Sequence, residues 1–248
     1  MHPLDGPTLK LDRAHEHLDQ LEAEFRSFLR LNPYEVIPQP NPEEGLDMYR
    51  LKVTRSPPAR LGIIIGDAIH NLRSALNHLA WQLALLKTAT PDRRTEFPIF
   101  IDPNAKGLKK RMADFRPEAR VEIERLQPYH RLNPGVPVDF LWAIHELSNL
   151  DKHRNLAIIS YGLVISMTTS AGKRPSLTLI GRFEDGTEIP MPAFPAQFQS
   201  QVNFKVEPTL AVVFKEGGPE GFLPVNQIGP MYHFVRNEVF PRFVQFFP

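Results

Sequence analysis

The sequence predicts an α+β protein: a helical bundle with a C-terminal antiparallel sheet and a final helix. Apolar residues recur at helical spacing through most of the first 154 residues, whereas residues 155–228 show alternating and β-branched runs separated by turn signals such as Asp185-Gly186. Helical spacing returns in residues 229–248. We therefore expect a mainly helical domain over residues 1–154, a β region over residues 155–228 that packs on it, and a C-terminal helix that returns to the bundle.

The individual elements follow from the same periodicities. One short strand is expected over residues 48–54, and helices are expected over residues 8–31, 59–87, 117–127, 137–152 and 230–247. Pro241 is expected to interrupt the last helix, because proline lacks the backbone donor and clashes with the preceding turn. Residues 32–45 contain four prolines and are expected to form a connector.

Composition excludes several classes of function. The chain has 29 basic and 28 acidic residues, so no global field attracts it to nucleic acid or to a membrane surface. It contains no cysteine, which excludes disulfides, thiolate nucleophiles and zinc–thiolate sites. The first ten residues lack the pattern of a secretory signal, and no apolar run is long enough to span a bilayer. We expect a soluble cytoplasmic protein with no membrane partner.

One face of the helix expected over residues 59–87 has the composition of a functional site. Its polar residues share one side of the helix at about 100° per residue: Asp67, His70, Asn71, Arg73, Ser74, Asn77, His78 and Trp81. Lys and Glu, which a solvated face would favour, are absent from residues 61–86. Since Asn, Ser, Asp and His are poorer helix formers, we expect this face either to line a pocket or to form a buried polar network.

A second polar stripe lies on the helix expected over residues 137–152. It consists of side chains at spacings of three and four: Trp142, His145, Asn149, Lys152 and His153. Lys152 and Arg154 also suit the negative end of a helix dipole, which is their alternative role. We expect the two stripes to face each other across the site.

Arg73 and His78 are separated by four residues, and this R-x4-H spacing on a helix resembles the catalytic motif of the HEPN superfamily. HEPN proteins are compact helical bundles, often dimeric, and many are metal-independent ribonucleases of toxin or phage-defence systems. The resemblance implies a homodimeric endoribonuclease that binds RNA and uses no cofactor. His78 would move the proton of a ribose hydroxyl, and Arg73 would stabilise charge on the phosphate. His153 is a further catalytic candidate, and the expected substrate-binding residues are Asp67, His70, Asn71, Asn77, His145, Asn149 and Lys152.

Two other functions fit the same residues. One is an enzyme that acts on a small molecule in a pocket between residues 67–78 and 145–154, with or without a metal on Asp67, His70 and His153. The other is a non-catalytic binding or dimerisation protein that uses the polar face as a structural network. A zinc protease is not expected, because Asn149 stands where the H-E-x-x-H motif has its second histidine.

An RNA partner would depend on local basic residues, because the net charge is close to zero. The candidates are Lys109, Lys110, Arg111, Arg116 and Arg120. The same residues would otherwise form an ordinary solvated surface.

Overall fold

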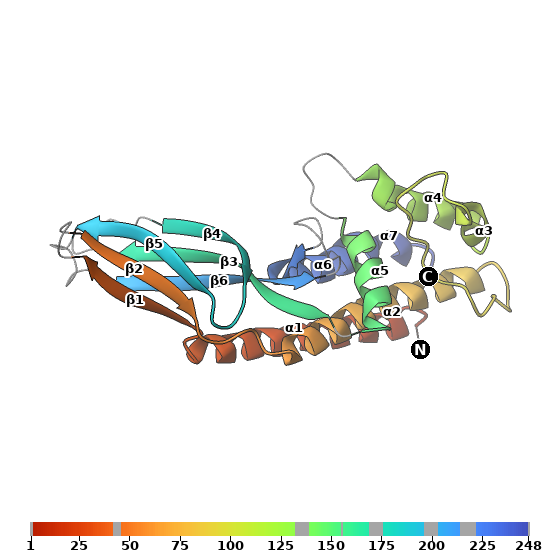
Figure 1. The fold of residues 1–248 in the computed structure, drawn as a ribbon. Helices are drawn as coiled ribbons and strands as arrows, with labels where there is room; N and C mark the ends of the chain where they lie inside the picture. The colour runs from red at the N-terminus through yellow and green to blue at the C-terminus, as the bar shows by residue number, and fades with distance from the viewer. Residues whose placement is uncertain are drawn as a thin grey trace. The chain divides into compact units, whose positions relative to one another are not determined.

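The structure is a computed structural model, and it describes residues 2–41, 46–131, 139–154, 156–168, 176–195, 203–213 and 222–247. It is a mixed α and β protein with antiparallel sheets, as the sequence predicts (Figure 1). The chain divides into two compact units. The helical unit comprises Met1–Leu21, Gly62–Leu156 and Phe214–Pro248, and the β unit comprises Glu22–Leu61 and Ala157–Val213.

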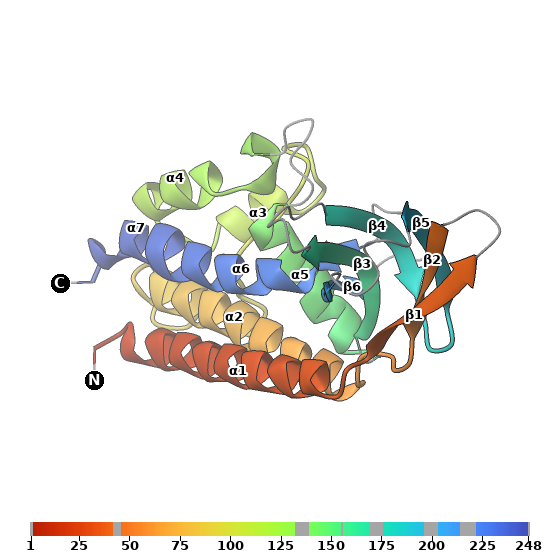
Figure 2. The same ribbon diagram turned by 90° about the vertical axis from the view of Figure 1, so that its left-hand side faces the viewer.

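The helical unit is built from helices that are distant in the sequence. Figure 2 shows α1, α2 and α6 side by side, and stacking of His15 on Tyr232 joins α1 to α6. Its elements are α1 (Asp5–Arg30), α2 (Arg60–Leu85), α3 (Leu108–Met112), α4 (Pro117–Arg125), η1 (Pro128–His130), α5 (Phe140–Asp151), β7 (Phe222–Pro224), η4 (Val225–Gln227), α6 (Ile228–Phe234), η5 (Val235–Val239) and α7 (Pro241–Val244). The ends of α1 and α2 that adjoin the strands belong to the β unit.

The apolar side of α2 lies at the centre of the helical unit, as the helical spacing of its apolar residues predicts. Nine of its residues are 0% exposed: Ile65, Ala68, Ile69, Leu72, Ala75, Leu76, Leu79, Ala80 and Leu83. Complete burial of one Leu or Ile side chain contributes about 1.5–3 kcal/mol relative to its exposure. The predicted interruption at Pro241 is also confirmed, since a π-helical turn (η5) precedes it and α7 starts at it.

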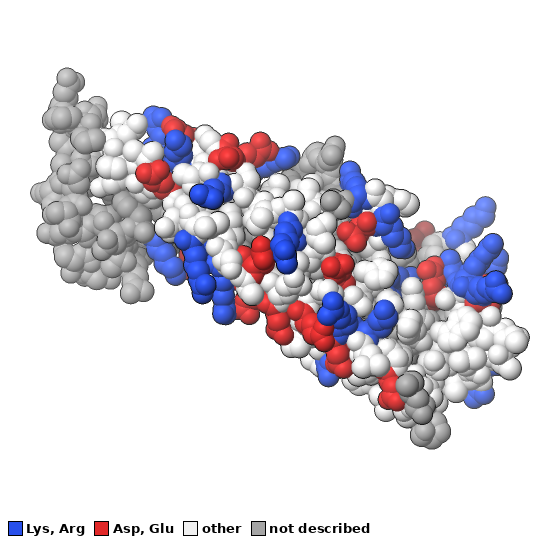
Figure 3. Space-filling model, turned by 90° about the horizontal axis from the view of Figure 1, so that it is seen from below, with Lys and Arg blue, Asp and Glu red and all other residues white. Residues whose placement is uncertain are grey.

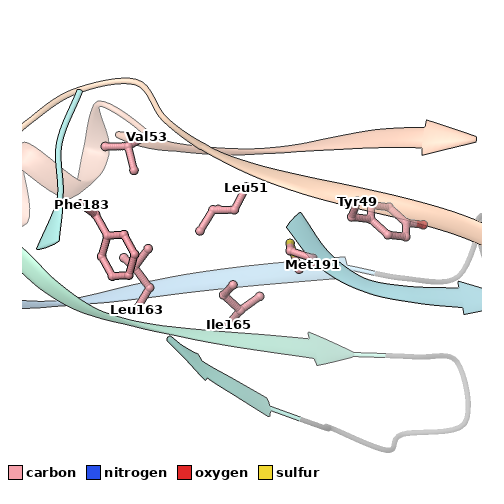
Figure 4. Packing of buried hydrophobic residues seen from close by; sticks show 7 residues of the cluster. All are labelled: Tyr49, Leu51, Val53, Leu163, Ile165, Phe183 and Met191. Atoms are coloured by element: carbon pink, nitrogen blue, oxygen red, sulfur yellow. The ribbon is translucent and has the colours of Figure 1, made fainter. Parts of the chain in front are cut away.

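Six strands form two antiparallel layers in the β unit. One sheet has the order β1-β2-β5, with β1 (Tyr34–Asn41), β2 (Leu46–Val53) and β5 (Glu188–Pro195). In the other, β3 (Ala157–Thr168) lies between β4 (Ser176–Phe183) and β6 (Asn203–Val213). Figure 4 shows the core between them, to which alternate residues of each strand contribute: Tyr49, Leu51, Val53, Leu163, Ile165, Phe183 and Met191.

The β unit differs from the prediction because it also contains strands from the N-terminal part of the chain. Residues 32–45 were predicted to form a connector, and this prediction is wrong for the residues of β1, which pairs with β2 throughout its length. The strand β1 lies at the edge of its sheet, where proline is tolerated because one side of the strand needs no ladder donor. Pro38 and Pro40 therefore do not prevent strand formation. Among the described residues, no helix combines the length and apolar character needed to cross a bilayer.

Candidate functional site

The polar face of α2 does not meet one common partner. Arg73 and Asn77 contact residues 96–100, which follow α2 without regular secondary structure and are called the extended segment below. Asp67 and His70 lie near Asp151 of α5, and His78 lies beside α1. These three sets of residues have different surroundings, and we describe each in turn.

Arg73 and Asn77 hold the extended segment in place. Arg73 Nη1 donates to the carbonyl oxygen of Phe97 at 3.0 Å, and the Phe97 amide donates to Asn77 Oδ1 at 3.2 Å. Arg73 is only 5% exposed. Both polar groups of Phe97 are therefore satisfied by side chains of α2, which is the buried network that the composition of this face allowed for.

Glu96 connects this network to α3. Its carboxylate accepts from Arg73 Nη2 at 3.3 Å and from Arg111 Nη2 at 2.7 Å. Burial lowers the pKa of Arg73, and the charge of Glu96 opposes that shift. Two guanidinium groups thus share one carboxylate, which leaves a local excess of positive charge.

His145 of α5 lies in the field of this cluster. Burial, followed by the charge of Arg73, lowers the pKa of His145 to about 4. Lys152 adds to the effect, whereas Glu96 opposes it. The imidazole is therefore neutral at physiological pH, unlike an exposed histidine, whose pKa is about 6.5.

A chain of hydrogen bonds fixes which nitrogen of His145 carries the proton. Lys152 Nζ, which can only donate, lies 3.1 Å from Asn149 Oδ1. The amide group of Asn149 therefore points its Nδ2 at His145 Nε2, 3.1 Å away. Because Nε2 accepts this hydrogen bond, the proton of the neutral ring lies on Nδ1.

The Nδ1 atom of His145 is buried and has no partner among the described residues. The same holds for Oγ of Ser148, one helical turn further along α5, which is 3% exposed. Buried polar atoms are normally paired, because an unpaired one costs about 1–3 kcal/mol. His145 Nδ1 and Ser148 Oγ are therefore suited to meet polar groups that the described part of the chain does not supply.

A cavity of about 290 Å³ lies against a neighbouring face of α5, and neither His145 nor Ser148 is among its lining residues. It is lined by Glu146, Asn149, Leu150, His153 and Arg154. Asn149 belongs both to the cavity and to the hydrogen-bond chain of His145. We call this cavity and the adjoining cluster of Arg73, Glu96, Arg111, His145, Asn149 and Lys152 the α5 site.

His78 lies outside the α5 site. It is five positions along α2 from Arg73, which places the two side chains about 140° apart around the helix. A methyl group on Gly6 of α1 would lie 3.8 Å from His78 Nδ1. Burial, and then the charge of Lys10 on α1, lowers the pKa of His78. The structure thus brings Arg73 together with His145 and not with His78.

Asp67 and His70 are exposed at the other end of the polar face. Asn71, between them and Arg73, turns back to donate to the carbonyl oxygen of Asp67 at 2.8 Å. Burial raises the pKa of Asp151; the charge of Asp67 raises it further, and His70 opposes this. In the part of the chain that the structure describes, no three His, Asp or Glu side chains are grouped as metal ligands, Asp67, His70 and His153 included.

Helices α2 and α5 lie close together where Gly66 meets the side chain of Asp151. A Cβ atom on Gly66 would lie 2.4 Å from Oδ1 of Asp151, which is closer than any real contact. We expect Gly66→Ala to lower the free energy of unfolding by about 1–3 kcal/mol, as overpacking does. Urea denaturation measures this, and adding Asp151→Ala should restore most of the loss.

Gly229 of α6 provides the matched control, because no atom lies within 4 Å of the Cβ position there. Gly229→Ala is expected to be neutral or stabilising, since alanine favours the helix. A Gly66→Ala protein as stable as the Gly229→Ala protein would contradict the close approach of α2 and α5.

Several residues of the site carry no recognisable signal in the sequence. Glu96 lies in an irregular segment without periodicity, and Ser148 is one of many serines. A second cavity, of about 750 Å³ in the β unit, is formed by segments that no motif connects, among them residues 25–36 and 205–208. Such sites arise only when distant segments meet.

The chain matches no protein-family model, and comparisons with curated proteins and with solved structures find no significant similarity. A functional assignment therefore depends on the geometry of the α5 site and on the HEPN-like spacing on α2.

Proposed function

We propose that the protein is a metal-independent endoribonuclease that acts at the α5 site. The observation that carries the proposal is the position of a neutral histidine, His145, within the field of the buried guanidinium group of Arg73. Cleavage of RNA through the ribose 2′-hydroxyl needs these two groups: a neutral base for the hydroxyl proton and a cation for the phosphate.

In the proposed reaction His145 Nε2 is the base, because its lone pair faces the polar side of the site. The Nδ2 of Asn149 now occupies the donor position at 3.1 Å, and a substrate hydroxyl would take its place. The 2′-oxygen loses its proton to Nε2 and forms a bond to phosphorus, while the bond from phosphorus to the 5′-oxygen breaks. His153, which lines the cavity with Asn149, protonates the departing 5′-oxygen.

Three cations surround the reacting phosphate in this scheme. Arg73, Arg111 and Lys152 all lie close enough to His145 to lower its pKa. Only Glu96 among the described residues of the cluster carries a negative charge, and its oxygens occupy the place between two guanidinium groups that phosphate oxygens would take. Preorganised cations of this kind stabilise the charge that develops on the phosphorane oxygens.

The proposal keeps one residue of the HEPN-like motif in its implied role and reassigns the other. Arg73 remains the phosphate-stabilising residue, whereas the base is His145 of α5 in place of His78. In the free protein Asn149 and Lys152 hold the imidazole of His145 through the hydrogen bonds described above, and the substrate hydroxyl replaces the one from Asn149.

Purified protein, incubated with a single-stranded RNA oligonucleotide in excess EDTA, tests the proposal. We expect cleavage, with 2′,3′-cyclic phosphate and 5′-hydroxyl ends that mass spectrometry identifies. The 2′-O-methyl version of the same oligonucleotide is the control and should stay intact, because it has no 2′-proton to lose. Cleavage of both, or of neither by the folded protein, would contradict the proposed reaction.

A second candidate substrate is a small phosphodiester. The cavity, at about 290 Å³, is near the lower limit of small-molecule sites and would hold little more than one nucleotide. Hydrolysis of bis(p-nitrophenyl) phosphate, which has no 2′-hydroxyl, without cleavage of RNA would favour this candidate.

A further inference from the structure

The segment that follows α2 concentrates positive charge. Residues 87–111 contain seven basic and three acidic residues, a net charge of +4, whereas the whole chain has a net charge of +1. On the face drawn in Figure 3, basic and acidic side chains alternate over most of the surface. At the right-hand end of this view, where Figure 1 places α3 and the end of α2, Lys and Arg atoms form a group.

Most of these cations have no acidic partner. Among the described residues, six exposed ones form no salt bridge: Lys87, Arg93, Arg94, Lys106, Lys109 and Lys110. The three carboxylates of the segment are already engaged. Asp92 and Asp102 accept from backbone amides at 2.8 Å, and Glu96 binds Arg73 and Arg111.

Hydrogen bonds hold these cations together as one surface. Arg111 Nη1 donates to the carbonyl oxygen of Arg94 at 2.6 Å, and Lys87 donates to the carbonyl oxygen of Ala113. The loop after α2 is thereby fixed against α3. Arg111 also pairs with Glu96, so this residue of the α5 site adjoins the loop that carries Arg94.

We propose that the basic surface, defined as Arg93, Arg94, Lys106, Lys109 and Lys110, binds the phosphate backbone of a single-stranded nucleic acid and leads it through Arg111 to the α5 site. The inference rests on the proposed function, since the bound strand is the substrate of that site. Exposed cations without acidic partners can bind the phosphates of a flexible strand, because each phosphate contact releases a counterion.

Binding of a fluorescent 2′-O-methyl RNA 12-mer, which the site cannot cleave, tests the surface by anisotropy at several salt concentrations. We expect Lys109→Gln/Lys110→Gln to raise the Kd about fivefold or more and to reduce the slope of log K against log salt by about 1.4, or 0.7 for each lost contact. Arg13→Gln/Arg26→Gln on α1 removes the same charge from exposed positions. It should change the Kd less than twofold.

A dinucleotide substrate separates this inference from the proposed function, because it is too short to reach the basic surface. Cleavage of UpA should be unchanged by Lys109→Gln/Lys110→Gln. Equal Kd values for the wild type and this variant would overturn the basic surface while leaving the α5 site intact. Tight binding of the 12-mer with no cleavage of UpA or RNA would instead overturn the proposed function. Binding to phosphatidylserine vesicles, without binding of the 12-mer, would assign the surface to a membrane and overturn the inference.

Discussion

Replacing His145 with alanine is expected to slow RNA cleavage by about 10²–10⁴-fold, the usual contribution of a general base. The reason is that no other described histidine combines a neutral ring with the field of Arg73. Initial rates on the RNA oligonucleotide in EDTA measure the effect. Circular dichroism and thermal unfolding verify that the variant is folded, which is expected because the ring leaves one of its nitrogens unpaired.

Two further variants make the result specific. His233→Ala, at an exposed position of α6, is the control and should retain full activity. His78→Ala decides between the two histidines: the HEPN-like spacing predicts loss of activity, whereas the separation of His78 from Arg73 predicts little change. Full loss in His78→Ala and none in His145→Ala would return the base to α2 and contradict the proposed site.

The pH dependence of kcat/KM is a second test of the role of His145. Since the base must be unprotonated, kcat/KM is expected to fall as pH drops through the pKa of His145, which is about 4. An ordinary histidine would place this limb near pH 6.5. Lys152→Met removes one of the charges that lower this pKa, so the limb should move to higher pH. A limb near 6.5 in the wild type would exclude His145 as the base.

Gln127→Ala is expected to cause the largest loss of stability, about 2–4 kcal/mol. Gln127 is 0% exposed and makes three hydrogen bonds. Its Nε2 donates to the carbonyl oxygens of Pro98 at 2.9 Å and Ile123 at 3.0 Å, and its Oε1 accepts from the amide of Phe100 at 3.0 Å. Alanine would leave buried backbone groups of the extended segment unpaired and would also create a cavity. Urea denaturation at constant pH measures the change.

Gln20 of α1 is exposed and serves as the control, because Gln20→Ala should change the free energy of unfolding by no more than about 0.5 kcal/mol. Gln127→Glu keeps the acceptor and the shape but replaces the donor, and it should be destabilising as well. A loss below about 1 kcal/mol in Gln127→Ala would mean that water replaces the three bonds.

The parts of the fold that could be predicted depend on local periodicity. The arc of α2 around Leu72 and Leu76 was predictable because residues three and four apart share a face wherever the helix packs. The break at Pro241 was predictable because it depends only on the chemistry of proline. The strand β1 was not, because its prolines are tolerated only at a sheet edge, and edges are set by pairing between distant segments.

Only part of the candidate site could likewise be predicted from the sequence. The absence of Lys and Glu from residues 61–86 predicted specific partners for the polar residues of α2; Arg73 and Asn77 have such partners, whereas Asp67, His70 and His78 are exposed. Periodicity cannot tell which neighbour each side chain meets, so it grouped His78 with Arg73. Glu96 could not be predicted, because its role depends on the place where an irregular segment crosses α2 and α3.

The interleaving of the two units has a consequence for the nascent chain. Leu51 of β2 pairs with Ile189 of β5, so one edge of the β1–β2 hairpin has no partner until the ribosome has made residue 189. Unpaired strand edges with apolar faces associate readily with one another. We therefore expect the unpaired edge of the hairpin to be open to chaperones until then, and the β unit to be completed only in a late, slow step dominated by long-range pairing.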